Sequence, residues 1–364
     1  MKKILYASLL VLAACADKAP KADGPLFGEI DINAPIIPGA KLSEIFGDYR
    51  IIPLETNDSS LIGGVMYSPQ RYIKHDGRFY VNSENAVLVF DNDGKFIQRL
   101  DRYGEGPGEY SYFSDYNVIP ATTGTEIWVS GNSRIHRYDA ATLEFKGDFP
   151  LENYGLESYY VNDSTVLIHQ NQGREVAVYT VDGRKRMDFY DHNPAEIVAG
   201  GATMAFTPLG NDVVLNVAGT NDAIVYYSDG DSLGFRKMVT PQDDLITLEK
   251  ARELDAQYGQ PESFREARKY IALGDIRKVG DQTVMINMMP EGDNYYLKFL
   301  LSTPEGTKAY RAYPEGGDAL VNDINDSQIV LSTIHMTQSP DSFLFVALPE
   351  DDNNPSLVEL KSFK

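Results

Sequence analysis

A repeated strand pattern constrains this chain more than any other feature. Each unit has a short alternating strand, a turn, a second strand and an aromatic-rich strand that ends in a turn with Asp or Gly. Units begin near residues 72, 117, 159, 206, 276 and 321, so successive starts lie 45, 42, 47, 70 and 45 residues apart. A period in the forties with four strands per unit is typical of β-propellers. The sequence therefore predicts an all-β fold, a six-bladed β-propeller.

The ends of the repeat region predict how the ring closes. An open sheet edge would expose unpaired backbone groups, so a propeller must pair its first and last strands. Strand-like residues 49–54 precede the first unit, and Leu357-Val358-Glu359-Leu360 follow the last. We expect one or both segments to complete a shared blade.

The single long spacing indicates an insertion between blades four and five. Residues 242–273 lose the strand pattern, and Leu245, Leu248, Ala251 and Leu254 recur at three-residue steps, which predicts a helical face. A Gly-Gln-Pro break at 259–261 then favours a second helix. We predict a short helical insertion over about 242–273.

The N-terminus reads as an export signal. Met1-Lys2-Lys3 is basic, and the apolar run 4–14 is shorter than the roughly 20 residues a bilayer span needs. Leu-Ala-Ala before Cys15 resembles the bacterial lipobox, although an ordinary signal peptide with a chance cysteine remains an alternative. We therefore expect a lipoprotein signal peptide over 1–14, lipidation of Cys15, a flexible linker over 15–44 and the propeller over 45–364. The expected location is the cell envelope, on the outer membrane.

Composition and motifs exclude several functions. The formal charge of -20 disfavours nucleic acid as a partner. Cys15 is the only cysteine, so its lipidation would leave no thiol for a disulfide, a nucleophile or a zinc site. The five histidines form no recognised metalloprotease or hydrolase motif. We expect no catalytic residue, metal or cofactor, and membrane contact through the lipid alone.

Two local motifs add a family resemblance. Residues 51–56 read Ile-Ile-Pro-Leu-Glu-Thr, and residues 104–110 read Gly-Glu-Gly-Pro-Gly-Glu-Tyr. With the repeats and the lipobox, they resemble the TolB-like six-bladed propeller lipoproteins of Bacteroidota. The second motif is also similar to the interblade turn of NHL-repeat propellers. The resemblance implies a propeller on a lipid anchor and carries over no catalytic residue, and the sixth unit departs from the family pattern.

Candidate binding residues follow from propeller geometry. Interblade loops open on the same face as each blade's second-to-third loop, so the 104–110 loop and the helical insertion should face each other across one channel mouth. The candidates on that face are Glu105, Glu109, Tyr110, Arg134, Arg174, Asn221, Asp222 and His335. Two plainer interpretations remain open: solvated loops are simply polar, and Glu109 only bonds backbone amides in a tight turn.

These features favour a non-enzymatic binding or interaction module for a glycan, a peptide or a partner protein. One alternative is a metal-dependent hydrolase resembling the six-bladed lactonases. The other is a structural subunit of an envelope complex. Fold alone does not decide among them.

Overall fold

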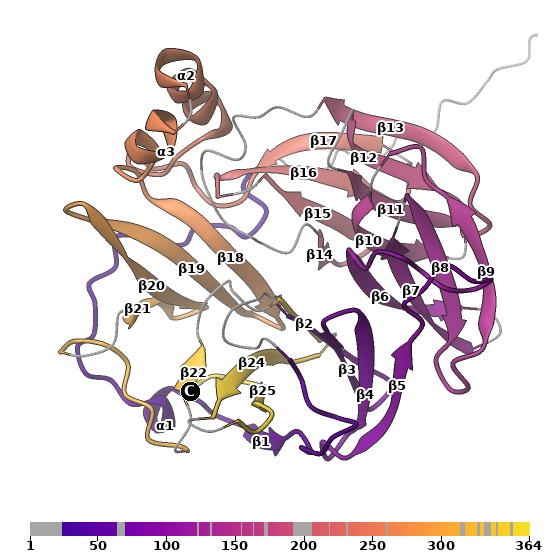
Figure 1. Cartoon of the computed structure of the whole chain (residues 1–364). Coiled ribbons are helices and arrows are strands. Elements are labelled where there is room, and N and C mark those ends of the chain that lie inside the picture. Colours follow the sequence, from indigo (N-terminus) through magenta and orange to yellow (C-terminus); the bar gives the residue numbers. More distant parts are fainter. Residues whose placement is uncertain are drawn as a thin grey trace, which may run out of the picture.

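The fold is a six-bladed β-propeller, as predicted. The computed structural model describes residues 24–63, 70–121, 124–131, 133–153, 155–162, 164–170, 174–191, 206–217, 219–230, 232–259, 261–313, 317–325, 328–330, 336–339, 341–349 and 352–364. These residues form six β-sheets set in a ring (Figure 1). Cys15 and the expected signal peptide lie outside the described residues.

Five blades follow one another along the chain, and in the second to the fifth the first strand lies nearest the channel (Figure 1). The first two are β2 (Arg71–His75), β3 (Arg78–Ser83), β4 (Ala86–Asp91) and β5 (Phe96–Asp101), then β6 (Asp115–Ala121), β7 (Gly124–Gly131), β8 (Arg134–Asp139) and β9 (Phe145–Pro150). The third and fourth are β10 (Gly155–Asn162), β11 (Thr165–Gln170), β12 (Arg174–Tyr179) and β13 (Lys185–Asp191), then β14 (Phe206–Leu209), β15 (Asp212–Asn216), β16 (Asp222–Tyr227) and β17 (Ser232–Lys237). The fifth is β18 (Ala272–Val279), β19 (Gln282–Glu291), β20 (Asn294–Thr303) and β21 (Gly306–Tyr313).

The sixth blade is built from both ends of the chain. Its strands are β22 (Gln328–Val330), β24 (Phe343–Leu348), β25 (Ser356–Leu360) and β1 (Tyr49–Pro53), in the order β1-β25-β24-β22. Ile51 pairs with Val358 in the antiparallel β1–β25 register. The prediction that terminal segments share a blade is confirmed, with β1 as its outermost strand.

Two details of the last blade were not predicted. The expected strand at residues 321–324 is wrong, because Val321 instead forms an isolated bridge with Lys41 of the N-terminal segment. A short extra strand, β23 (Met336–Gln338), runs parallel to β2 and gives the first blade a fifth strand.

The core lies between blades, which explains the nearly continuous apolar strands. Every residue of Ala86-Val87-Leu88-Val89-Phe90 in β4 is buried. Successive side chains of a strand point to opposite faces, and each propeller blade has a neighbour on both. Val87 and Val89 accordingly pack with Tyr116 toward the second blade, whereas Leu88 and Phe90 pack toward the closing blade.

The helical insertion lies between β17 and β18, the fourth and fifth blades counted from β2. It contains α2 (Leu248–Tyr258) and α3 (Glu262–Ala267). Thr247 caps α2 by accepting a hydrogen bond from the Lys250 amide at 3.1 Å, and Gly259 ends it with φ of 66°. The flanking residues Leu245 and Leu273 belong to the core between these two blades, so only the helices project from the ring.

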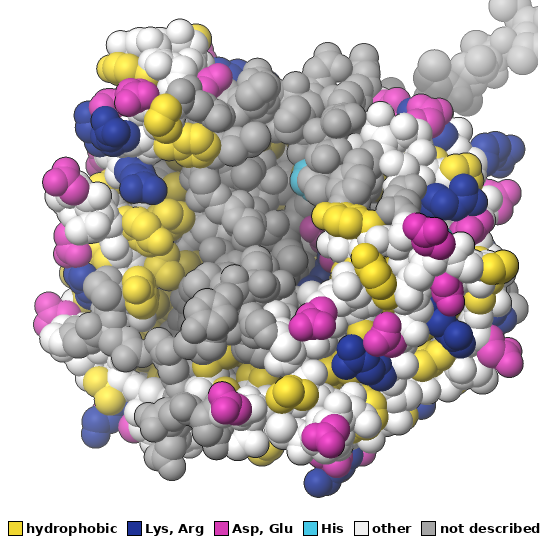
Figure 2. Space-filling model, in the orientation of Figure 1, with side chains coloured by type: hydrophobic (Ala, Val, Ile, Leu, Met, Phe, Trp, Pro, Cys, Tyr) yellow, Lys and Arg dark blue, Asp and Glu magenta, His cyan; other side chains and the backbone are white. Residues whose placement is uncertain are grey.

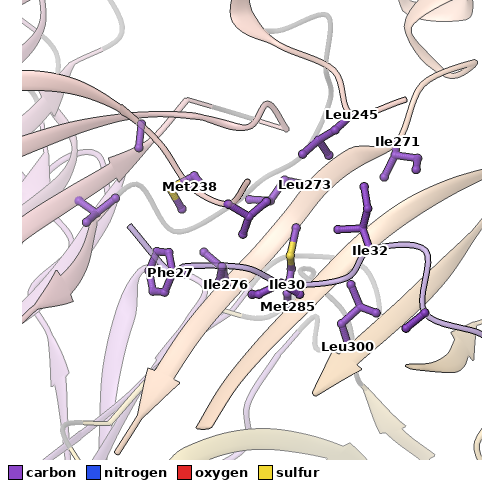
Figure 3. Close-up of a cluster of buried hydrophobic side chains, with 14 of the residues drawn as sticks. Phe27, Ile30, Ile32, Met238, Leu245, Ile271, Leu273, Ile276, Met285 and Leu300 are labelled. Atoms are coloured by element: carbon purple, nitrogen blue, oxygen red, sulfur yellow. The ribbon is translucent and has the colours of Figure 1, made fainter. Parts of the chain in front are cut away.

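The segment before β1 is not a flexible linker from residue 24 onward, which corrects the expectation for residues 24–44. Phe27, Ile30 and Ile32 are buried between the blades β14–β17 and β18–β21, beside Met238, Leu273, Ile276, Met285 and Leu300 (Figure 3). A short helix, α1 (Leu42–Ile45), follows and buries Leu42 and Ile45. We call residues 24–34 the strap.

Polar contacts hold the strap along its length. The amides of Leu26 and Phe27 donate to the carbonyls of Lys237 and Met238 at 2.9 Å, which extends the edge of β17. Farther along, the buried Lys298 ammonium donates to the Ile32 carbonyl at 2.8 Å. The strap therefore seals the seam between two blades before the chain reaches the closing strand.

A buried carboxylate joins the closing blade to the first blade. Glu359 in β25 accepts hydrogen bonds from Arg50 Nε of β1 at 2.6 Å, from Lys74 of β2, and from Ser342 Oγ at 3.0 Å. Burial raises the pKa of Glu359, but the hydrogen bonds from Lys74, Arg50 and Ser342 more than offset this, so its pKa lies below the ordinary value. The ionised form thus stabilises the closed ring.

The strap should contribute measurably to stability. Ile32→Ala removes a fully buried side chain and should lower the free energy of unfolding by about 2–4 kcal/mol. Ile37→Ala is the matched control, because Ile37 is 42% exposed and its loss should cost less than about 1 kcal/mol. Urea unfolding of both variants measures the difference, and equal effects would show that the strap does not pack as described.

Glu359→Gln should weaken closure and change its pH dependence. We expect a loss of about 2–4 kcal/mol in unfolding free energy at pH 7, because Arg50 and Lys74 lose their shared carboxylate. Since the folded pKa is lowered, the wild-type contribution is present above the unfolded value of about 4.3 and is lost as pH falls through the folded pKa. Denaturation from pH 7 to 3 should therefore show the two proteins converging, whereas the exposed control Glu249→Gln stays parallel to wild type.

Candidate functional site at the channel mouth

Strand order separates the two ends of the ring. Neighbouring strands in each consecutive four-stranded run are antiparallel, so every blade-to-blade connection leaves from one end, which we call the connection end. The β2–β3 and β4–β5 turns lie at the opposite end, which we call the hairpin end. The β5–β6 connection and the insertion with α2 and α3 both leave from the connection end, on opposite sides of the ring (Figure 1).

The β5–β6 connection is held by its own side chains. Glu109 Oε2 accepts a hydrogen bond from the Gly106 amide at 2.8 Å, and a Cβ at Gly104 would lie 2.1 Å from the same oxygen. Tyr110 is fully buried and donates its hydroxyl to the Asn85 carbonyl at 2.7 Å. Glu109 and Tyr110 therefore build the turn, and of the three predicted residues here only Glu105 is exposed.

Beside this turn lies a half-exposed aromatic and ionic surface. The Tyr112 carbonyl oxygen lies against Gly131, where a Cβ would come within 2.0 Å of it, and Gly131 pairs with Arg134 across the β7–β8 hairpin. Arg134 donates to both oxygens of Asp148, at 3.2 and 2.6 Å. The Tyr112 residue is 49% exposed, and the Arg134 side chain is 40% exposed. We call Tyr112, Arg134 and Asp148 the blade-two corner.

Two further predicted residues anchor the helical insertion. Buried Asn221 donates to the Val239 carbonyl at 3.1 Å and accepts from the Val239 amide at 3.0 Å. Asp222 pairs with Lys237 at 2.5 Å and accepts from the Leu248 amide at 2.7 Å, at the start of α2. The side chains of Asn221 and Asp222 therefore hold the insertion in place. Arg174 begins β12, but its side chain and the whole of His335 lie outside the described residues.

The structure reveals a charge cluster that sequence reasoning missed. Arg71 donates to Asp115 at 2.8 Å and to Glu157 at 3.0 Å, and the exposed fractions of the three residues are 1%, 7% and 6%. These residues lie near the starts of β2, β6 and β10, the first strands along the chain in three consecutive blades. Tyr116 closes the cluster, with its hydroxyl 2.9 Å from the Arg71 carbonyl oxygen. We call these residues the channel cluster.

Burial dominates the electrostatics of the channel cluster. Desolvation raises the pKa of Asp115 to about 7, with Arg71 opposing the shift and Glu157 adding to it. One guanidinium thus pairs with two buried carboxylates, and Asp115 holds its proton to a higher pH than an ordinary aspartate does. The repeat carries a signal for it, because Arg71 and Asp115 each stand directly before a tyrosine at the start of a unit, and Glu157 stands two residues before Tyr159.

Metal ligands and membrane spans were also sought among the described residues. No group of three or more His, Cys, Asp or Glu side chains there is placed to hold a metal ion. In the same residues, no helix has the length and hydropathy to cross a bilayer.

Comparison with known proteins places the chain in a family. Its fold is a six-bladed β-propeller in which the strap packs between the fourth and fifth blades. The chain belongs to the family described as domain of unknown function DUF4934, whose model matches residues 28–333. No curated protein matches it.

Solved structures agree with the fold. The chain is similar to an exported protein of Bacteroides fragilis NCTC 9343, with a TM-score of 0.64 and 14% identity over 93% of this chain and 99% of that one. It is less similar to U3-55K, with a TM-score of 0.45 and 11% identity over 88% of this chain and 100% of that one. An extracellular domain of a one-component system from B. thetaiotaomicron gives a TM-score of 0.43 and 9% identity, over 86% of this chain and 40% of that chain. At 14% identity, the likeness to the B. fragilis protein shows the fold alone.

Asp115→Asn should change how stability depends on pH. Because the folded pKa of Asp115 is raised, its contribution is full below the unfolded value of about 3.9 and is lost as pH rises through about 7. Relative to wild type, the variant should therefore gain on the order of 2–4 kcal/mol in unfolding free energy between pH 4 and pH 8. Urea unfolding across that range tests this, with exposed Asp93→Asn as the control. A difference between variant and wild type that does not change with pH would contradict the cluster's electrostatics.

Proposed function

We propose that this protein is an exported envelope protein, anchored through lipidated Cys15, whose propeller binds a glycan, a peptide or a partner protein without catalysing a reaction. The B. fragilis protein of the same fold is an exported protein, which supports export. The short apolar run that ends at Cys15 supports the lipid anchor, and the outer membrane is its proposed location.

The blade-two corner is the observation that carries the binding proposal. Tyr112 is 49% exposed, and the exposed part of an aromatic side chain can contact a sugar ring or an apolar peptide side chain. Arg134 and Asp148 on the adjoining β8 and β9 strands are already aligned by their two hydrogen bonds, so a ligand would meet a preorganised donor and acceptor. Hydrogen bonding to Asp148 raises the pKa of Arg134, and the same bonds lower the pKa of Asp148, so both stay charged at neutral pH.

The neighbouring carboxylates already accept hydrogen bonds from the protein itself, which favours binding over catalysis. A catalytic acid or base must reach a substrate atom with a free hydrogen-bonding position. In the described part of the connection end, Glu109 is tied to its own turn and Asp222 to the start of α2. Asp115 and Glu157 both bind the Arg71 guanidinium. These side chains hold the mouth in shape.

The base of the insertion should be left intact in any test. Leu245, Ile271 and Leu273 lie in the core between the fourth and fifth blades, so deleting residues 242–273 would damage the ring as well as remove the helices. Point substitutions at the blade-two corner avoid this problem.

Tyr112→Ala and Arg134→Ala should each weaken binding tenfold or more on arrays of immobilised glycans and peptides. A loss of about 1.4 kcal/mol, which corresponds to tenfold, is ordinary for an aromatic or arginine side chain at the centre of an interface. Ile97→Ala is the control, because Ile97 is 41% exposed at the start of β5, at the hairpin end. Ligands that bind wild type and both corner variants equally would contradict a site at this corner.

A further inference from the structure

A cavity, which we call the closing-seam pocket, lies at the hairpin end, where the closing blade meets the first blade. Its volume is about 380 Å³. The lining comes from the start of β1, the ends of β2 and β25, the β4–β5 turn and Asp341, which stands two residues before β24. It therefore lies at the other end of the ring from the blade-two corner.

The floor of this closing-seam pocket is rigid. Glu359 is 2% exposed and holds Arg50 from β1 and Lys74 from β2. The other end of the Arg50 guanidinium donates to Asn92, to its carbonyl at 3.0 Å and to its side-chain oxygen at 2.6 Å. Three strands and a turn are thus joined around the cavity before any ligand arrives, which lowers the entropic cost of binding.

The side chains that line the pocket have more hydrogen-bond donors and acceptors than the bonds between the closing and first blades use. Arg50 carries five N–H donors, and three hydrogen bonds to Glu359 and Asn92 leave further N–H groups. Lys361 lines the pocket with an exposed side chain. Asp48 and Asp341 supply acceptors, and the Asp341 side chain is 65% exposed. The lining therefore contains both donors and acceptors.

The charges of the lining select the ligand class. Three cations, Arg50, Lys74 and Lys361, balance three carboxylates, Asp48, Asp341 and Glu359. A small anion would face Asp48 and Asp341 on a protein of formal charge -20, and a small cation would face Lys361. A neutral molecule with many hydroxyl groups suits such a lining, because every hydroxyl both donates and accepts. The volume lies in the range of about 300–1,000 Å³ typical of small-molecule sites.

We propose that the closing-seam pocket binds a neutral saccharide of one or two sugar units. Charged planar groups such as the Asp341 carboxylate and the Arg50 guanidinium bind vicinal hydroxyl pairs, and Asn92 in the lining adds a side-chain amide. This site lies apart from the blade-two corner and does not depend on what binds there.

Titration calorimetry of the full chain with glucose, galactose, mannose, N-acetylglucosamine, maltose and cellobiose tests the proposal. We expect at least one sugar to bind with a dissociation constant on the order of 1 mM, about -4 kcal/mol. Asp341→Asn and Lys361→Ala should each weaken that binding at least tenfold. The matched controls are Asp93→Asn and Lys95→Ala, which make the same changes on the exposed β4–β5 turn beside Asn92 without altering the lining.

Thermal unfolding of each variant checks that the fold is intact, which we expect because Asp341 and Lys361 are exposed. Absence of binding by every sugar at 50 mM would overturn the proposal. Binding that all four variants retain equally would also overturn it, because the sugar would then bind elsewhere. Tighter binding of glucuronate than of glucose, lost in Lys361→Ala, would show an anion site instead.

Discussion

The pairing of β1 with β25 is the constraint on which the rest of the structure depends. A ring of sheets leaves no open edge only if its first and last strands meet, and here Tyr49–Pro53 pairs with Ser356–Leu360 across the length of the chain. The polypeptide before β1 must therefore run along the finished ring. It does so as the strap, which buries Phe27, Ile30 and Ile32 in the seam between two blades. One continuous N-terminal segment thus fills the interface between the fourth and fifth blades and then supplies β1, which completes the sixth blade.

Closure also gives the ring two chemically different ends. The connection end carries the longer segments between blades, including α2 and α3, and there the blade-two corner exposes Tyr112 beside an ion pair. The hairpin end carries short turns, and its distinctive feature is the seam where Glu359 joins the first and last blades. A rigid scaffold with separate surfaces at each end suits a protein that recognises other molecules.

The sequence predicted the elements whose signal repeats, and missed those that depend on three-dimensional placement. The strand period determined the blades, the shared last blade and the position of the insertion. The strap was missed because Gly and Pro around residues 24–39 resemble a linker, although Phe27, Ile30 and Ile32 carry an apolar pattern. Tyr110 was predicted to bind ligand but is buried. Its hydroxyl donates to the Asn85 carbonyl, and the sequence does not show whether a polar group near a loop bonds to the protein or faces solvent. The Arg71 cluster requires three blades to be placed side by side.

Hydrogen–deuterium exchange of the native protein tests the closed ring most directly. If β1 is the outermost strand of the last blade, the amides of Arg50 and Ile52 should exchange as slowly as those of the other outer strands, since peptides spanning 49–53 and 356–360 open together. Protection should fall in both peptides at once as denaturant is added. Rapid exchange across residues 49–53 with slow exchange in the rest of the ring would contradict the account, because the ring would then be open at its first strand.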